Sequence, residues 1–350
     1  MNDRLSRLRS TLPDLGASAI LVAQPANVLY LTGFSSSNAV VLLDDSARLF
    51  TDGRYIEAAR AVDGVDVVHA ERDLFGDLAK RLSELVEGPI AFEAEHLSVA
   101  QHTKLAGGGA TFVPAKQSVE RLRAVKDPAE LEAVRHSARL LNEAFELLGR
   151  ERVSGRTEAS LAWWMERTIR ELGAEAVSFS PIVASGPHAA LPHHHPGDRV
   201  IESGDVLLVD AGAVVDGYCS DCTRTFAVGE VAPALRRAYD VCLDAQLRSL
   251  DAVAAGAAAQ AVDAVARGII REHGYDVMHG LGHGVGLAIH EEPRLAETSA
   301  DQLAVSNVVT VEPGVYLAGH GGVRIEDMVV VGENGNEVLT PVTKELVTLS

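Results

Sequence analysis

Val206-Leu-Leu-Val-Asp-Ala-Gly-Ala-Val-Val-Asp-Gly-Tyr-Cys-Ser-Asp221 is the stretch of sequence that decides the fold. It predicts a buried strand that ends on Asp210, a tight turn at Asp216-Gly217 and a returning strand that carries Asp221, because Asp-Gly is a strong hairpin signal. The turn lies near the midpoint of positions 210 and 221, so we expect the two aspartates to lie roughly opposite each other. Opposed carboxylates repel unless a cation lies between them.

A second hairpin of the same kind is predicted nearer the C-terminal end. Residues 307–312 read as a strand that ends on Glu312, and Val323-Arg-Ile-Glu326 reads as the returning strand, with the midpoint inside the loop 318–322. A solvated turn charge would explain any single carboxylate, but two opposed pairs indicate a site for two divalent cations. Oxygen ligands favour Mn²⁺, Mg²⁺ or Ca²⁺, and an added imidazole shifts the preference toward Mn, Co, Zn or Fe.

Histidines gather in two segments, Leu191-Pro-His-His-His-Pro-Gly197 and His279-Gly-Leu-Gly-His-Gly-Val-Gly-Leu-Ala-Ile-His290. The alternating glycines of the second segment argue against a helix and allow close approach of the backbone around His283. A neutral imidazole is a common metal ligand, so His283 is a candidate. Cys219 and Cys222 are not expected to share a metal ion, because residues three apart on a strand point to opposite faces.

The first third of the chain predicts a separate α/β domain. Short apolar runs alternate there with helical patterns, and no glycine-rich phosphate loop follows any of them. Asp127-Pro128 then begins a long helix after a boundary near 121–127. We therefore expect two domains, 1–122 and 123–350. The strands and helices expected from these patterns cover 19–22, 39–43, 47–51, 65–68, 74–86, 90–92, 157–172, 232–254 and 260–273.

Composition restricts the function classes. The 350 residues include 31 basic and 49 acidic side chains, a net charge of −18, and such a surface repels nucleic acid and anionic membranes. The first residues lack the apolar core of a signal peptide, and no stretch approaches the roughly 20 apolar residues of a membrane span. Three cysteines without a signal peptide favour free thiols in a reducing compartment. We expect a cytoplasmic protein.

Residues 178–331 resemble the pita-bread metallopeptidases, in the branch that contains Xaa-Pro dipeptidase (prolidase) and aminopeptidase P. The resemblance implies an α+β pita-bread catalytic domain that follows an α/β creatinase/prolidase-like domain, and it implies a homodimer. It rests on four stretches: Asp-Ala-Gly…Asp-Gly-Tyr-Cys-Ser-Asp-Cys-Thr-Arg-Thr-Phe at 210–226, the glycine-histidine segment at 279–290, Val-Glu-Pro-Gly-Val-Tyr at 311–316, and Val-Arg-Ile-Glu-Asp at 323–327.

The resemblance also assigns roles. It implies two divalent ions, Mn²⁺ first with Co²⁺ or Zn²⁺ as alternatives, which activate a bridging hydroxide for attack on the carbonyl before proline. His193 and His290 would bind substrate and act in catalysis, Glu312 would transfer the proton, and Arg294 and Arg324 would bind substrate. The implied metal ligands, among which Asp221 and Glu326 bridge the ions, are Asp210, Asp221, His283, Glu312 and Glu326.

Arg294 refines the expected substrate. In His290-Glu-Glu-Pro-Arg294 the arginine follows the second histidine as it does in prolidases, and its guanidinium fork suits the free carboxylate of an Xaa-Pro dipeptide. We therefore expect a dipeptidase. A surface role for Arg294 and an aminopeptidase P that acts on longer peptides stay open. A methionine aminopeptidase would not need residues 1–120, and a metal-free creatinase-like hydrolase or a non-catalytic peptide-binding protein would not need the carboxylates.

Overall fold

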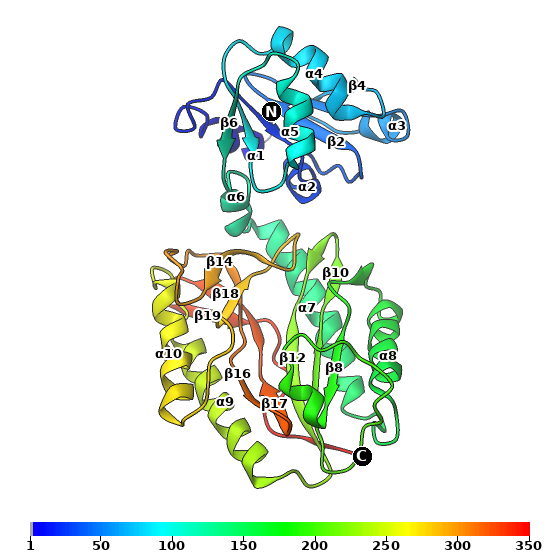
Figure 1. Ribbon diagram of the computed structural model, residues 1–350, viewed down its shortest axis with the longest axis vertical. Coiled ribbons are helices and arrows are strands. Elements are labelled where there is room, and N and C mark those ends of the chain that lie inside the picture. Colours follow the sequence, from blue (N-terminus) through cyan, green and yellow to red (C-terminus); the bar gives the residue numbers. More distant parts are fainter. Residues whose placement is uncertain (1–2) are drawn as a thin grey trace. The chain divides into compact units, whose positions relative to one another are not determined.

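The computed structural model describes residues 3–350 (Figure 1). The chain forms two compact units, the first ending at Arg123 and the second covering Ala124–Ser350. Within residues 3–350, no helix is both long enough and apolar enough to span a membrane.

The first unit is an α/β domain, as the sequence predicts. Its six-stranded sheet has the order β4-β3-β2-β1-β5-β6 and is mixed, because β2 runs antiparallel to β1 and to β3. Leu74, Leu78 and Leu82 form the buried face of α4 and pack in the core of this unit. The strands are β1 (Ala19–Val22), β2 (Ala39–Leu43), β3 (Ala47–Thr51), β4 (Asp66–His69), β5 (Ile90–Glu93) and β6 (Phe112–Ala115). The helices are α1 (Asp3–Arg9), α2 (Pro25–Thr32), α3 (Ile56–Ala59), α4 (Leu74–Leu85), α5 (Val99–Ala106) and α6 (Glu120–Ala124).

Four helices flank the strands of the second unit. The predicted helix start at Asp127-Pro128 is confirmed: Asp127 caps the helix by accepting from the backbone of Glu130, whose side chain accepts from the Asp127 N–H in return. One core packs α7 and α8 against a four-stranded sheet, and another packs α9 and α10 against a five-stranded sheet (Figure 1). The helices are α7 (Pro128–Leu148), α8 (Glu158–Glu171), α9 (Pro233–Asp251) and α10 (Ala259–Glu272), with a short 3₁₀ helix η1 (Gly186–Ala190).

The strands of the second unit form two main sheets and smaller pairings. The main orders are β20-β12-β9-β8 and β14-β13-β15-β18-β19, beside the hairpin β16-β17 and the small sheet β11-β10-β7. The strands are β7 (Ala176–Val177), β8 (Ile182–Ser185), β9 (Val206–Ala211), β10 (Ala213–Val215), β11 (Tyr218–Cys219), β12 (Cys222–Val228), β13 (Gly282–Gly284), β14 (Glu291–Leu295), β15 (Val308–Val311), β16 (Gly314–Leu317), β17 (Gly321–Arg324), β18 (Asp327–Gly332), β19 (Gly335–Val338) and β20 (Thr348–Leu349).

Strand register corrects one sequence prediction. The turn at Asp216-Gly217 is confirmed, since Val215 pairs with Tyr218 on either side of it. The same register pairs Asp210 with Thr223. Asp221 is therefore diagonal to Asp210 rather than opposite it, because the turn is centred one residue later than the midpoint of the two aspartates. Residues two apart on a strand share a face, so both carboxylates still point the same way.

The glutamate pair follows the predicted register. Val311 pairs with Asp327 at the end of β15, and Gly314 pairs with Arg324 at the start of β16. Glu312 and Glu326 lie between these two pairings and face each other.

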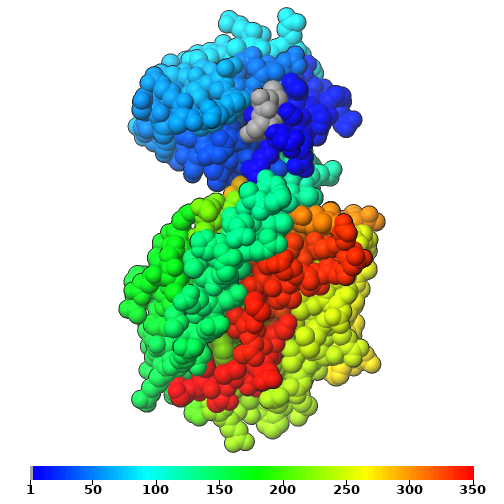
Figure 2. All heavy atoms as spheres, turned by 180° about the vertical axis from the view of Figure 1, so that it is seen from behind, coloured from blue at the N-terminus to red at the C-terminus, as the bar shows by residue number. Residues whose placement is uncertain are grey.

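Arg224 fastens the C-terminal segment onto the second unit. Its guanidinium donates to the Asp327 carboxylate at 2.7 Å and to the carbonyls of Thr340 and Val342 at 2.9 and 2.7 Å. The side chain is completely buried. Figure 2 shows these C-terminal residues, in red, lying beside α7 on the surface of the unit, where Asn142 also donates to the Leu339 carbonyl at 2.9 Å.

We expect Arg224→Met to destabilise the second unit, because the Asp327 carboxylate loses one of its donors and the carbonyls of Thr340 and Val342 lose the bonds from Arg224. Breaking a buried pair on one side costs about 3–5 kcal/mol. Urea unfolding can be followed by tryptophan fluorescence, since both tryptophans, Trp163 and Trp164, belong to this unit. Arg236→Met removes only an exposed pair with Asp240 and should change the free energy of unfolding by about 0.5 kcal/mol or less. Equal midpoints for the two variants would contradict the role given to Arg224.

Candidate metal centre

A cavity of about 640 Å³ in the second unit contains all the site residues predicted from the sequence. Its apolar wall includes Phe179, Ile182, Pro192 and Ile289. The predicted site residues that line it are His193, Asp210, Asp221, His283, His290, Arg294, Glu312, Arg324 and Glu326. Side chains that are up to 133 positions apart in the sequence therefore meet at one place.

The polar side chains reach the cavity from the ends of strands. Asp210 belongs to β9, and Glu312 directly follows β15. Glu326 lies between β17 and β18, and its N–H donates to the carbonyl of Thr223 at 3.1 Å. This bond joins the glutamate hairpin to the strand that follows Asp221, so the two carboxylate pairs are brought together by backbone hydrogen bonding.

Two glycines allow β13 to approach its neighbours closely. A Cβ atom at Gly282 would lie 2.1 Å from the carbonyl oxygen of Thr310, and one at Gly284 would lie 2.2 Å from that of Glu292. Both contacts are impossible for a side chain, so only glycine lets β13 lie between β14 and β15. The close approach predicted around His283 is confirmed, and it places the imidazole among the carboxylates.

The imidazole of His283 faces two carboxylates. Its Nε2 atom lies 3.6 Å from Oδ2 of Asp221 and 3.4 Å from Oε1 of Glu312. One ligand atom from each of Asp221, His283 and Glu326 can be chosen so that all three lie within 4.8 Å of one another. His283 Nδ1 lies 3.0 Å from the Gly284 carbonyl and donates to it, which leaves Nε2 directed at the carboxylates.

The electrostatics of the carboxylates suit a cation. Burial, followed by the charges of Glu326 and Asp210, raises the pKa of Asp221 well above its ordinary value. Burial and the charges of Glu312 and Asp210 likewise raise the pKa of Glu326. Oδ1 of Asp210 is buried without a hydrogen-bond partner. A divalent cation would give this oxygen a ligand and oppose the repulsion among the carboxylates, so the donor set fits a metal.

Arg324 lines the cavity as a buried side chain that is bonded to one of the carboxylates. Its Nη2 donates to Oδ2 of Asp210 at 2.6 Å, its Nε to Oγ1 of Thr223 at 3.1 Å, and its Nη1 to the Tyr316 hydroxyl at 3.2 Å. The side chain is buried. These bonds orient Asp210, and the prediction that Arg324 binds substrate stays untested.

Two threonines complete the site, and the sequence reasoning missed both. Thr223 donates from Oγ1 to Oε2 of Glu326 at 2.6 Å. Thr310 accepts from the N–H of His283 at 3.0 Å, and its Oγ1 lies 3.2 Å from Oε1 of Glu312. A signal was present: Thr223 is two residues after Asp221 and Thr310 is two residues before Glu312, and this spacing places side chains on one face of a strand.

The predicted substrate-side residues differ in exposure. The ring of His290 lies 4.4 Å from that of His283, centroid to centroid, and burial together with the charge of His283 lowers the pKa of His290. His193 is exposed where it lines the cavity. Arg294 is at the rim, with 72% of its side chain exposed and a 3.6 Å ion pair to Glu292.

A buried ion pair fixes the segment before β14. Lys126 Nζ lies 3.2 Å from Oε2 of Glu291, and both side chains are almost fully buried. Oε1 of Glu291 accepts from the N–H of Ala288 at 2.9 Å. These contacts hold the turn that leads to His290, and nothing in the local sequence pattern had pointed to Lys126.

Comparison with known proteins gives a consistent result. Residues 132–333 match the model of Metallopeptidase family M24, and residues 4–125 match the Creatinase/Prolidase N-terminal domain. An Xaa-Pro dipeptidase of Pyrococcus furiosus is 33% identical over 352 residues, which cover 99% of this chain and 100% of that protein. The structure of an Xaa-Pro dipeptidase from Bacillus anthracis superposes with a TM-score of 0.95 at 38% identity, covering 99% of both chains. An X-Pro aminopeptidase structure from Thermotoga maritima has a TM-score of 0.88 at 35% identity, covering 99% of this chain and 100% of that one.

Thr223→Val should weaken metal binding, because Glu326 loses the hydroxyl that orients it. Loss of such an outer hydrogen bond typically lowers metal affinity by about 10–100-fold. Calorimetric titration with Mn²⁺ measures the effect. Thr225→Val is the matched control: Thr225 is equally buried on the same strand but bonds the backbone of Arg324 instead of a carboxylate. Equal affinities in the two variants would rule out the orienting role of Thr223.

Proposed function

Because this chain belongs to metallopeptidase family M24 and has a Creatinase/Prolidase N-terminal domain, we propose that it is a metal-dependent Xaa-Pro dipeptidase. The observation that carries the proposal is the convergence of four carboxylates and one imidazole in a single cavity of the second unit. Two proteins that match almost the whole chain, from Pyrococcus furiosus and Bacillus anthracis, are named Xaa-Pro dipeptidases.

The proposed metal ligands are the four carboxylates and the imidazole of this cavity, namely Asp210, Asp221, His283, Glu312 and Glu326. Asp221 and Glu326 would serve both ions, as the resemblance implies. Burial and neighbouring carboxylate charges raise the pKa of both side chains, and their ligand atoms lie close to that of His283. A ligand set of mostly carboxylate oxygens favours Mn²⁺, with Co²⁺ and Zn²⁺ as alternatives. When bound, two divalent ions supply Lewis acidity that polarises a carbonyl and lowers the pKa of water.

The remaining chemistry belongs to side chains of the cavity. Glu312 accepts the proton of the attacking water as the new C–O bond forms, and returns it to the proline nitrogen as the C–N bond breaks. Oε1 of Glu312 is held near Thr310 and His283, at 3.2 and 3.4 Å. His290 donates a hydrogen bond to the carbonyl oxygen as negative charge develops there. His193 contacts the substrate from the opposite segment.

Proline explains the need for a dedicated site. Its ring removes the amide N–H, so a peptidase cannot use a backbone hydrogen bond at the scissile bond and must recognise the substrate by other groups. Arg294 at the rim is the proposed partner of the free proline carboxylate. The second candidate, an aminopeptidase that acts on longer peptides, is favoured by the similarity to the Thermotoga maritima structure named X-Pro aminopeptidase.

We also propose that the protein is a homodimer, as the family resemblance implies, and that it is located in the cytoplasm. Cys219, Cys222 and Cys242 are all buried and form no disulfide, which is typical of proteins from reducing compartments. Light scattering coupled to size-exclusion chromatography measures the molar mass in solution, which should be twice that of one chain.

The metal assignment is tested by Asp221→Ala and Glu326→Ala. Each variant should lose at least one metal ion per chain and all measurable hydrolysis of Ala-Pro, because each carboxylate serves both ions. Elemental analysis and a dipeptide assay supply the two readouts. Glu333→Ala removes an exposed carboxylate in the turn between β18 and β19 and should behave like the wild type. Full metal content with normal turnover in either site variant is incompatible with the assignment.

Substrate length is tested by comparing kcat/KM for Ala-Pro and Ala-Pro-Ala, and we expect the dipeptide to be preferred. The 72% exposure of Arg294 means that its pair with the carboxylate is solvent-screened, so it should contribute about 1 kcal/mol, or about fivefold in the ratio. Arg294→Ala should lower the ratio of kcat/KM for Ala-Pro to kcat/KM for Ala-Pro-Ala by this factor. Arg294→Lys keeps the positive charge and should lower the ratio less. A wild-type preference for the tripeptide would favour the aminopeptidase, and an unchanged ratio in Arg294→Ala would exclude Arg294 as the reader of the carboxylate.

A further inference from the structure

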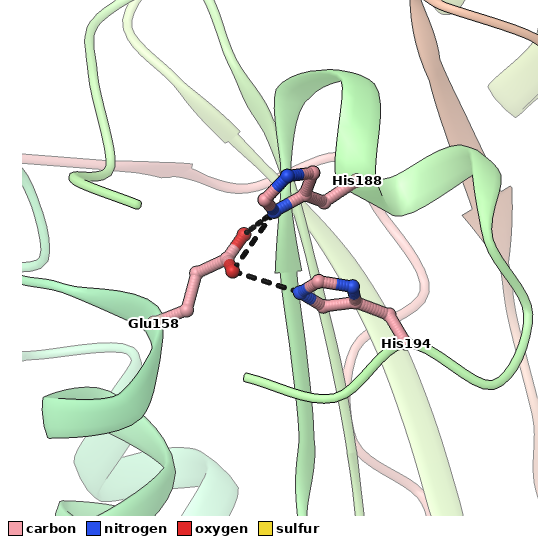
Figure 3. A group of neighbouring side chains, drawn as sticks. All are labelled: Glu158, His188 and His194. Carbon is pink, nitrogen blue, oxygen red and sulfur yellow. Dashed lines mark hydrogen bonds and ion pairs between the residues drawn. The ribbon is translucent and has the colours of Figure 1, made fainter. Parts of the chain in front are cut away.

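Glu158, His188 and His194 form a second cluster of metal-binding side chains, and none of them lines the cavity described above. Glu158 is the first residue of α8, His188 lies in η1, and His194 lies in the loop that follows η1. Figure 3 shows both imidazoles pointing toward the carboxylate of Glu158.

The distances within the cluster are close to those of a metal site. His188 Nδ1 lies 3.0 Å from Oε2 of Glu158, and His194 Nε2 lies 2.8 Å from the same oxygen. A tetrahedral zinc ion with bonds of about 2.0–2.2 Å separates its ligand atoms by about 3.4 Å. Small rotations of the two rings would therefore admit the ion. One ligand atom from each residue already lies within 4.8 Å of the others.

The carboxylate is supported as a metal ligand would be. Glu158 is completely buried, and its Oε1 accepts from the N–H and the hydroxyl of Ser185, both at 2.8 Å. The hydroxyl of Ser185 in turn accepts from Arg199 at 2.5 Å, and Arg199 is held by two bonds to Asp205. Hydrogen-bonded support of this kind orients ligating carboxylates. It leaves Oε2 directed at the two histidines.

We propose that Glu158, His188 and His194 bind a Zn²⁺ ion, or another ion that accepts imidazole such as Co²⁺ or Ni²⁺, at a site separate from the candidate metal centre. Two imidazoles and one carboxylate form a three-ligand set with one position left for water. His188 is 39% exposed at the side chain, so an ion can reach the cluster. Imidazole ligands favour these ions over Mn²⁺, which the carboxylate-rich centre prefers.

The position of the cluster gives the ion a structural consequence. His194 directly follows His193, which lines the cavity, and an ion at the cluster would tie the loop of both residues to α8 and η1. Adding Zn²⁺ should therefore raise the melting temperature of a chain whose candidate metal centre is disabled by Asp221→Ala and Glu326→Ala, whatever reaction the cavity performs in the wild type.

The test uses the full chain carrying Asp221→Ala and Glu326→Ala, which removes two ligands of the candidate metal centre. Calorimetric titration with Zn²⁺ should show one site per chain, and adding His188→Ala with His194→Ala should abolish it. His195→Ala is the matched control, because it removes an exposed histidine of the same loop that lies outside the cluster. Its titration should retain the site.

A single substitution keeps the test valid if the variant with both histidines replaced does not fold. His188→Ala alone removes one ligand from a partly exposed position, and it should lower the Zn²⁺ affinity by more than the roughly 10–100-fold typical of an outer hydrogen bond. Circular dichroism checks that each variant is folded. The reference protein is the chain that carries Asp221→Ala and Glu326→Ala. The proposal is overturned if adding His188→Ala gives a folded protein with the same Zn²⁺ affinity and stoichiometry as this reference. It is also overturned if the reference binds no Zn²⁺ that depends on His188 and His194. These outcomes are independent of peptidase activity in the wild type, so the two proposals fail separately.

Discussion

Mutual repulsion among buried carboxylates is the constraint on which the second unit depends. Asp210, Asp221, Glu312 and Glu326 point into one cavity, and burial together with their like charges raises the pKa of the two that the proposal places between the ions. A protein built for stability alone would not place four such groups together. The arrangement is reasonable only if a cation occupies the space between them, and this is why the geometry leads to a metallopeptidase.

Hydrogen bonds and close packing in the rest of the unit hold these four carboxylates together against their mutual repulsion. Two hairpins present them, and the backbone bond from Glu326 to Thr223 joins these hairpins. Glycines at 282 and 284 let the histidine strand approach where any side chain would collide. Arg324 and two threonine hydroxyls hold individual oxygens in place. Arg224, one position beyond Thr223 and on the other face of the strand, anchors the C-terminal segment behind the site.

The two clusters divide the ligand chemistry of this unit. The cavity offers mainly oxygen ligands and contains the proposed substrate-facing groups, whereas Glu158, His188 and His194 offer mainly nitrogen, and His194 belongs to the same loop as His193. Both rely on the same device, a buried carboxylate with one oxygen saturated by protein donors and the other directed at an imidazole or a cation. This device lets a protein bury charge and keep it available for a ligand.

Resemblance to the pita-bread metallopeptidases assigned most of the residues that gather at the cavity. The sequence by itself determined the α/β class of the first unit, most helix and strand positions and the glutamate register. These follow from local signals, because an Asp-Gly turn, a capping box and strand alternation act over a few residues. Tertiary structure alone decided the diagonal placement of Asp221, the exposure of Arg294, the burial of Arg324 and the meeting of Glu158 with His188 and His194. Each of these depends on contacts between segments distant in the sequence, and such contacts are set by how helices and sheets pack rather than by any pattern along the chain.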